Sequence, residues 1–191
     1  MVDITSIQKA VKTALEKAPE RKFRESVDIT VHLRNIDMSQ PKNRIDETFL
    51  LPHGFDNVKI AVLGKGDIVT QAKEANVDLI LGPEDIERLG GEPREARKIA
   101  DEYRFFLAET AMMPLVGRYL GVRLGPRGKR PIPISQATDI RPIVQRLRNS
   151  VKIRTKDKKV FHTKVGTTAM DPAEIAENID TILRRVESVL E

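Results

Sequence analysis

Two glycine-containing loops in this chain have the residue types that can bind phosphate groups. Gly64 and Gly66 follow the apolar run "VKIAVLG", at the kind of β-to-α turn where dinucleotide-binding domains carry their phosphate loop. That fingerprint needs a small third residue so that the helix can pack closely, and this chain has Val69 there. We therefore interpret the loop as a tight turn capped by Asp67, with nucleotide binding as the alternative.

The second loop is the stretch "LGPRGKRPIP", Leu124 to Pro133, which combines cations, glycines and prolines. It follows no P-loop spacing and leads into prolines rather than into a helix. Its cations Arg127, Lys129 and Arg130 are nevertheless candidate phosphate contacts.

Positive charge is concentrated in one part of the chain. The segment 117–164 contains fourteen lysines and arginines and only two acids, Asp139 and Asp157, although the whole chain has a net charge of only +5. A solvated face would explain some of this, but a segregation over 48 residues favours a polyanionic partner. Because aromatic residues make up only 4% of the chain, shaped RNA or a DNA backbone fits better than extensive base stacking.

The strands after Asn149 give the most specific basic pattern. "SVKIRT" and "KVFHTKVG" flank the polar turn "KDKK" and are predicted to form a hairpin. Alternation places four basic side chains on its open face, namely Lys152, Arg154, His162 and Lys164. These side chains either bind a phosphate backbone or only keep the face soluble.

The segment "ERKFRES" places an aromatic ring between cations directly before an expected strand. Phe23, flanked by Lys22 and Arg24, either packs on a ribose or base or covers the edge of the domain. The residues alone leave both readings open.

The residues give little support for a metal site, a membrane span or an enzyme active site. The chain has no cysteine, and its three histidines are too scattered for a local metal site, so we expect neither a metal nor a cofactor. No apolar run is long enough to cross a membrane. Adjacent acids such as Glu84, Asp85 and Glu87 have the pattern of the first turn of a helix rather than of paired catalytic carboxylates. We therefore expect a protein that is not an enzyme.

The helices and strands expected to position these residues show two different sequence patterns, one at the ends of the chain and one in its middle. At the N-terminus we expect a helix from Ser6 to Lys17, with a capping box between Thr5 and Gln8, followed by an alternating strand at 26–34. From Val58 onward, short apolar strands alternate with helices, among them one continuous helix at 83–103, which indicates a parallel sheet. After the basic strands comes a last helix, with Asp171 as its N-cap and Pro172 and Glu174 in its first turn.

This order predicts an α/β protein with one domain inserted into another. Residues 1–56 and 151–191 would form a discontinuous α+β outer domain, and residues 57–150 an inserted α/β domain. Neither outer piece could easily bury a core alone.

Five ordered motifs then resemble the ribosomal protein L-one family in its archaeal form. They span nearly the whole chain and read "RKFRESVDITVHL", "NRIDETFLLPHG", "KIAVLGKGD", "MMPLVGRYLGVRLGPRGKRP" and "KVFHTKVG". The resemblance implies an outer domain of split β-α-β type and an inserted, Rossmann-like three-layer domain without a nucleotide.

The resemblance also implies a function in the cytoplasmic ribosome. Members of this family bind large-subunit ribosomal RNA at a mobile stalk and contact other ribosomal components. They also assist release of the exit-site tRNA and repress translation of their own mRNA. No membrane partner is implied, and we expect a monomer off the ribosome. The alternatives are an α/β enzyme with a nucleotide or phosphorylated substrate and, less favoured, a DNA-binding architectural protein.

Family contacts carry over by motif onto the outer domain. The implied RNA surface comprises the cations of the basic strands together with Lys22, Phe23, Arg24, Glu25, Ser26, Arg44, His162, Lys164 and Gly166. Glu25 would accept a hydrogen bond from a 2′-hydroxyl or orient a neighbouring cation. Arg127, Lys129 and Arg130 become secondary RNA or interdomain contacts.

One departure from the family concerns the end of the chain. Members usually continue past the last helix into a strand with a Thr-Met-Gly turn, whereas this sequence stops at Glu191. The stretch "TTAM" at 167–170 precedes the helix and is not that turn. We expect the chain to fold but to bind RNA more weakly than a longer chain.

Overall fold

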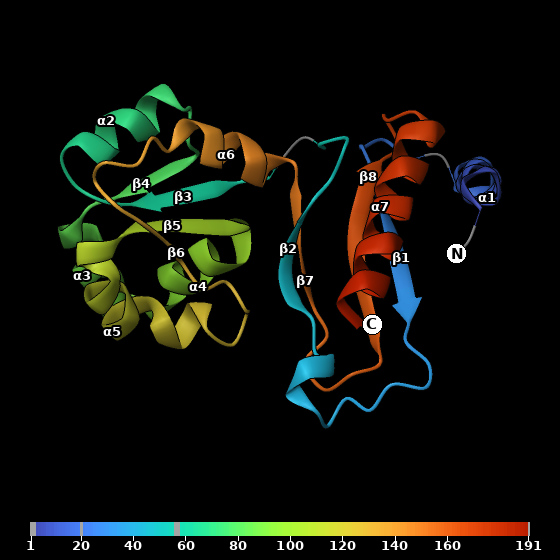
Figure 1. Ribbon diagram of the computed structural model, residues 1–191. Helices are drawn as coiled ribbons and strands as arrows, with labels where there is room; N and C mark the ends of the chain where they lie inside the picture. The colour runs from blue at the N-terminus through green and yellow to red at the C-terminus, as the bar shows by residue number, and fades with distance from the viewer. Residues whose placement is uncertain (1–2, 20, 56–57, 191) are drawn as a thin grey trace. The chain divides into compact units, whose positions relative to one another are not determined.

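The computed structural model describes residues 3–19, 21–55 and 58–190. Glu20 of the basic segment, positions 56 and 57 at the predicted domain boundary, and the terminal Glu191 lie outside the described residues. The chain divides into two compact units (Figure 1). Unit 1 comprises Met1–Phe55 with Asn149–Glu191, and unit 2 comprises Asp56–Arg148.

Unit 2 is a parallel four-stranded sheet between two layers of helices. The strand order is β4-β3-β5-β6, and all the pairings are parallel. In chain order its elements are β3 (Ile60–Leu63), α2 (Asp67–Glu74), β4 (Leu79–Leu81), α3 (Pro83–Gly91), α4 (Pro93–Glu102), β5 (Phe105–Glu109), η2 (Thr110–Met112), α5 (Met113–Leu124), β6 (Ile132–Ile134) and α6 (Arg141–Arg148). Helices α2 and α6 cover one face, and α3, α4 and α5 cover the other (Figure 1).

The central strands of this sheet are apolar because both of their faces are covered. Every residue of β3 is buried, with Ala61 in the core under α3, α4 and α5 and Val62 in the core under α2 and α6. Such strands lack period-two alternation, as expected for a parallel sheet with helices on both sides. The predicted α/β fold class is confirmed.

Three predictions within unit 2 are wrong in detail. The continuous helix expected at 83–103 is broken at Glu92, where α3 ends and Pro93 starts α4, because a proline cannot donate to the preceding turn. The stretch expected to be only a basic loop contains the short strand β6, which pairs with β5. The cap of α2 is Gly66, at φ +59°, rather than Asp67.

Unit 1 pairs strands from opposite ends of the sequence. Its elements are α1 (Ile4–Lys17), β1 (Ser26–His32), η1 (Pro41–Asn43), β2 (Asp46–Leu50), β7 (Ser150–Arg154), β8 (Val160–Thr167) and α7 (Pro172–Leu190). Strand β1 pairs antiparallel with β8, and β2 pairs antiparallel with β7. The predicted hairpin pairing of β7 with β8 is therefore wrong, because each strand takes its partner from the N-terminal segment.

One shared core holds unit 1 together. Ile7 and Val11 of α1, Phe161 and Val165 of β8, and the inner face of α7 pack into one cluster. The alternation predicted for β1 is confirmed: Val27, Ile29 and Val31 are partly buried, and the residues between them are exposed.

Of the two helix N-termini predicted in unit 1, the structure confirms the cap of α7 but not the cap of α1. At α7, Asp171 Oδ1 accepts from the backbone N–H of Ala173 at 2.8 Å, and Glu174 Oε2 accepts from the N–H of Asp171 at 3.2 Å. The N-cap predicted there is confirmed, and Glu174 completes a capping box with it. At α1 the predicted box is wrong: the helix begins earlier, after Asp3, and the Thr5 hydroxyl donates to the Asp3 carboxylate.

Candidate nucleic-acid interface

The open face of the β1–β8 ladder carries two of the predicted basic side chains. His162 lies opposite Thr30 and Lys164 opposite Asp28, and residues opposite one another in a ladder share a face. The Lys164 ammonium lies 4.7 Å from the centre of the Phe55 ring, a cation–π contact that holds the charge in place. The face is thus polar and mixed in charge, with Lys164 fixed and His162 exposed.

The segment before β1 is the most exposed part of this surface. Lys22, Phe23 and Arg24 are all exposed, and Phe23 leaves 65% of its surface open. Beside it lies a hollow of about 390 Å³, lined by Phe23, Ser26 and Asp28 among others. Since most of the Phe23 ring is open to solvent, covering a domain edge does not account for this side chain.

Glu25 is tied into the same segment by three contacts. Its carboxylate pairs with Arg21 at 3.0 Å. Its backbone N–H donates to Thr168 Oγ1 at 3.3 Å, and its carbonyl accepts from the Thr168 N–H at 3.0 Å. Of the two roles considered for Glu25, orienting a neighbouring cation matches this ion pair. Ser26 follows as the exposed first residue of β1, opposite Thr167.

The two cations of β7 are engaged by a carboxylate of the neighbouring strand. Lys152 Nζ lies 2.5 Å from Asp46 Oδ1, and Arg154 Nε lies 3.5 Å from Asp46 Oδ2. Both side chains are more than two-thirds buried. They belong to the β2–β7 ladder, so the four basic side chains predicted for one hairpin face sit on two separate ladders.

Arg44 also makes contacts within the protein. Its Nε donates to the carbonyl of Met38 at 2.9 Å, and its Nη2 donates to that of Ser39 at 3.1 Å. The guanidinium therefore holds the loop that leads into β2, while the side chain as a whole remains exposed.

Gly166 differs from the other candidates because it is buried. A Cβ built at this position would lie 2.8 Å from Ile175 Cγ1 and 3.3 Å from Met170 Sδ. The close approach of α7 to β8 accounts for the glycine without any ligand.

We expect Gly166→Ala to destabilise the protein by about 1–3 kcal/mol, because the neighbouring side chains would have to move. Urea unfolding followed by circular dichroism would measure this change. Gly117→Ala is the matched control, since nothing lies within 4 Å of a Cβ there, and it should be neutral or stabilising. Equal curves for both variants would contradict the packing role.

The basic loop of unit 2 is bound to the C-terminal end of α4. Arg127 Nε lies 2.5 Å from Asp101 Oδ1, and Lys129 Nζ donates to the carbonyls of Ala100 at 2.6 Å and Asp101 at 3.2 Å. A cation is favoured there by the helix dipole. Burial, followed by the charge of Arg104, lowers the pKa of Lys129. Arg130, the third candidate cation of the loop, is exposed.

The Asp101–Arg127 pair should make the stability of unit 2 depend on pH. The hydrogen bond from Arg127 lowers the pKa of Asp101 below its ordinary value. The stabilisation is therefore present above the ordinary carboxyl range and is lost as the pH falls through the lowered pKa. We expect Asp101→Asn to melt at a lower temperature than the unmodified chain at pH 7, with the difference shrinking below about pH 4. Calorimetry would check this, and a constant difference from pH 3 to 7 would contradict it.

The glycine loop after β3 holds a carboxylate of the protein itself. Glu109, at the end of β5, is only 1% exposed. Its Oε2 accepts from the backbone N–H of Lys65 at 3.2 Å, and its Oε1 accepts from Gln136 Nε2 at 2.7 Å. The Glu109 carboxyl group thus occupies the turn where a nucleotide phosphate would bind in a dinucleotide-binding domain.

Sequence reasoning missed the residues that connect unit 1 internally. Asn178, fully buried in α7, donates to the carbonyls of His53 and Val165, both at 2.9 Å, and accepts from the His53 N–H at 3.0 Å. The His53 ring lies 2.6 Å from Glu177. One signal was available: Asn178 interrupts the apolar face formed by Ile175 and Ile182. Its partners, 125 and 13 residues away, could not be read from the sequence.

The fold and this surface define a class: a two-unit protein with an exposed aromatic and basic surface on unit 1 and a Rossmann-like unit 2. Residues 13–191 match the family described as Ribosomal protein L1p/L10e, and the chain belongs to this family. Within the described ranges, no helix is long and apolar enough to cross a membrane.

Several archaeal relatives are similar along the whole chain. The large ribosomal subunit protein uL1 of Methanoculleus marisnigri is 85% identical over 191 residues, and that of Methanoregula boonei is 69% identical over 192. The uL1 of Methanosarcina mazei is 45% identical over 192 residues. In each case the match covers all of this chain and 90% of the relative.

Proposed function

We propose that this protein is a structural constituent of the large ribosomal subunit in the cytoplasm and binds large-subunit ribosomal RNA through unit 1. Membership of a ribosomal protein family supports the assembly. The observation that carries the RNA-binding surface is Phe23, 65% exposed between Lys22 and Arg24 and beside a hollow. Unit 1 is accordingly the RNA-binding domain, and unit 2 is the inserted domain.

The contacts of this surface divide into two kinds. Phe23 offers a ring on which a base or ribose can stack, and Lys22, Arg24 and Lys164 offer charge to phosphates. Folded RNA is read mainly by shape and through its 2′-hydroxyls. A surface that positions a few cations and hydroxyls around one ring suits that mode.

Four further candidate side chains have a different proposed role. Lys152, Arg154, Arg44 and Glu25 hold neighbouring segments in place, and each can still present an edge to RNA. Gly166 acts through the packing of α7. In unit 2, Arg130 is the best placed of the secondary contacts, since Arg127 and Lys129 bind α4.

At the ribosome we propose a place in the mobile stalk, with contacts to other ribosomal components and a role in release of the exit-site tRNA. Off the ribosome, the protein would be a monomer that represses translation of its own mRNA by binding an RNA that mimics the ribosomal site. These roles rest on the family resemblance and on the same surface of unit 1.

The buried carboxylate of Glu109 argues against the rival function, an enzyme with a nucleotide or phosphorylated substrate. Its carboxyl group already accepts from the N–H of Lys65, a donor that a phosphate at that turn would need. The carboxylates near Phe23 each have a cation close by: Glu25 pairs with Arg21, and Asp28 lies opposite Lys164 in the ladder.

A comparison of RNA with DNA tests the proposal. The protein is titrated with a fragment of large-subunit ribosomal RNA and with the same sequence in deoxyribose form. We expect markedly weaker binding to the DNA, because the 2′-hydroxyl contacts and the A-form shape are lost. Equal affinity for the two would point to a DNA-backbone binder, and stabilisation by nucleotide alone would point to the enzyme.

A further inference from the structure

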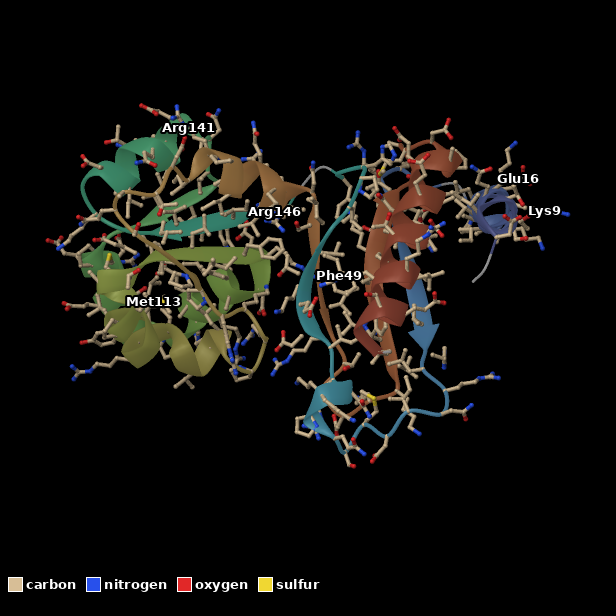
Figure 2. All side chains as sticks on the ribbon, in the orientation of Figure 1. Lys9, Glu16, Phe49, Met113, Arg141 and Arg146 are labelled. Carbon is tan, nitrogen blue, oxygen red and sulfur yellow. The ribbon has the colours of Figure 1, made fainter. Side chains whose placement is uncertain are left out.

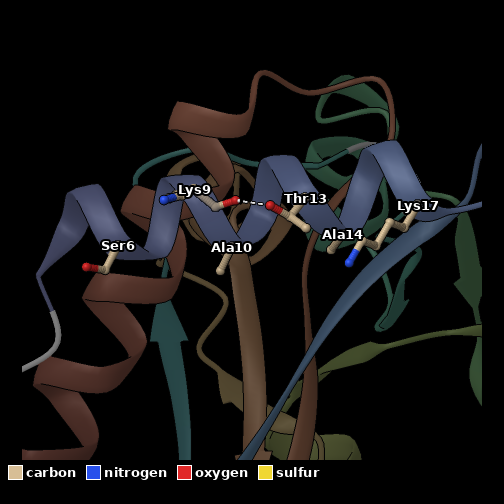
Figure 3. Close-up of a pocket in the computed structure, with 6 residues that line it drawn as sticks. All are labelled: Ser6, Lys9, Ala10, Thr13, Ala14 and Lys17. Atoms are coloured by element: carbon tan, nitrogen blue, oxygen red, sulfur yellow. Dashed lines mark hydrogen bonds between the residues drawn. The ribbon is translucent and has the colours of Figure 1, made fainter.

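Helix α1 has an outward face with a shallow hollow that no contact described so far uses. The hollow has a volume of about 480 Å³ and is lined by Ser6, Lys9, Ala10, Thr13, Ala14 and Lys17 (Figure 3). All six residues are exposed.

The position of this face is set by the opposite side of the helix. Ile7 and Val11 are buried in the core of unit 1, with α7 as the neighbouring helix. Figure 2 shows Lys9 and Glu16 projecting from α1 on the sides away from α7. The hollow is therefore presented by a helix whose rotation is fixed by packing.

The chemistry of the lining suits a sugar–phosphate backbone. Lys9 and Lys17 are eight residues apart, or about 12 Å along the helix axis, and the lining contains no acidic residue. Between them Ala10 and Ala14 extend no further than a methyl group, which lets a bulky chain approach. The hydroxyl of Thr13 donates to the Lys9 carbonyl at 2.9 Å, so its oxygen can still accept a hydrogen bond from a 2′-hydroxyl (Figure 3).

A protein partner fits this face less well. The anchors of protein–protein interfaces are large aromatic, arginine and apolar side chains that fill pockets. The six lining residues include none of these. Two lysines around small and hydroxyl-bearing side chains favour a charged backbone instead.

The hollow also adjoins the one beside Phe23. Ala14 lines both of them, and Leu15 and Ala18 of the same helix end line the second with Phe23 and Ser26. The two hollows thus form one path around the C-terminal end of α1.

From this continuity and charge we propose that the RNA seated at Phe23 extends along α1, with phosphates beside Lys9 and Lys17. The inference rests on the proposed RNA-binding function and adds a second contact region to it. It assigns α1 a binding role in addition to its packing against α7.

The test is the double variant Lys9→Gln/Lys17→Gln, titrated with the ribosomal RNA fragment at several salt concentrations. We expect roughly tenfold weaker binding at 0.1 M salt. The log–log salt slope should fall by about 0.7–0.9 for each lysine removed. Both side chains are exposed, so helicity by circular dichroism should not change.

A charge-matched control is Lys12→Gln/Lys73→Gln. Lys12 lies on the same helix but outside the hollow, on a face shared with Glu16 four residues later, and Lys73 lies on α2 of unit 2. A second test variant, Ala10→Glu, places a carboxylate inside the hollow and should also weaken binding.

The outcomes separate the inference from the function beneath it. If the unmodified chain does not bind ribosomal RNA, the proposed function fails. If it binds but the Lys9/Lys17 variant loses no more affinity or salt slope than the Lys12/Lys73 control, the RNA does not reach α1 and the inference is overturned.

Discussion

Asn178→Ala is expected to destabilise the protein by about 3–4 kcal/mol, the largest effect of any change considered. The side chain makes three hydrogen bonds to main-chain groups of His53 and Val165, and it is fully buried. Its removal would strand those polar groups away from water, at about 1–3 kcal/mol each where no water can enter. The segment that leaves β2 would then lose its main-chain hydrogen bonds to α7.

Urea unfolding followed by circular dichroism would measure this loss. Ser188→Ala is the matched control on the same helix, because Ser188 is exposed and should change stability by less than about 0.5 kcal/mol. Hydrogen exchange at the His53 amide should also accelerate in Asn178→Ala. A destabilisation below about 1 kcal/mol would show that Asn178 is not the connection inferred here.

Phe23→Ala is expected to weaken binding to the ribosomal RNA fragment by about 1–3 kcal/mol, the range for an aromatic side chain that stacks on one base. Because 65% of Phe23 is exposed, the same change should leave the melting temperature almost unaltered. A loss of affinity without loss of stability is the signature of a direct contact.

Two further variants bracket that result. Phe23→Tyr keeps a stacking ring and should bind nearly as well as the unmodified protein. Val122→Ala removes a side chain that is 71% exposed on unit 2 and should change neither affinity nor stability. If Phe23→Ala and Val122→Ala bound RNA equally well, the role of Phe23 would be refuted.

Local elements were predictable wherever the pattern is short-range. Period-two alternation found β1, an apolar run found β3, and the Asp171 cap found the start of α7. Each of these signals depends on residues within a few positions of one another, so one sequence is enough to read it.

Pairings over long distances were not predictable. Strands β7 and β8 have the alternation and turn of a hairpin, but their ladder partners β2 and β1 lie 100 residues or more earlier. Strand β6 contains Pro133, which argues against a strand by its sequence. The proline is tolerated because β6 lies at the edge of the sheet, where one side needs no donor.

For the candidate surface too, the sequence shows the residue types but not their long-range partners. The charge of Lys152, Arg154, Arg127 and Lys129 is visible in the sequence, but their partners Asp46 and Asp101 are visible only in the fold. The loop "LGPRGKRPIP", the most conspicuous motif, uses two of its three cations to bind α4. Phe23 attracts less notice in the sequence, yet it leaves 65% of its surface open.

The central claim is that unit 1 binds large-subunit ribosomal RNA through the Phe23 segment and the open face of β8. Hydroxyl-radical footprinting on that RNA tests it most directly, with Phe23→Ala and Lys164→Ala beside the unmodified chain. We predict one protected region, within the stalk, that fades in both variants and persists in Val122→Ala. Protection outside the stalk, or protection that survives both changes undiminished, would contradict the account.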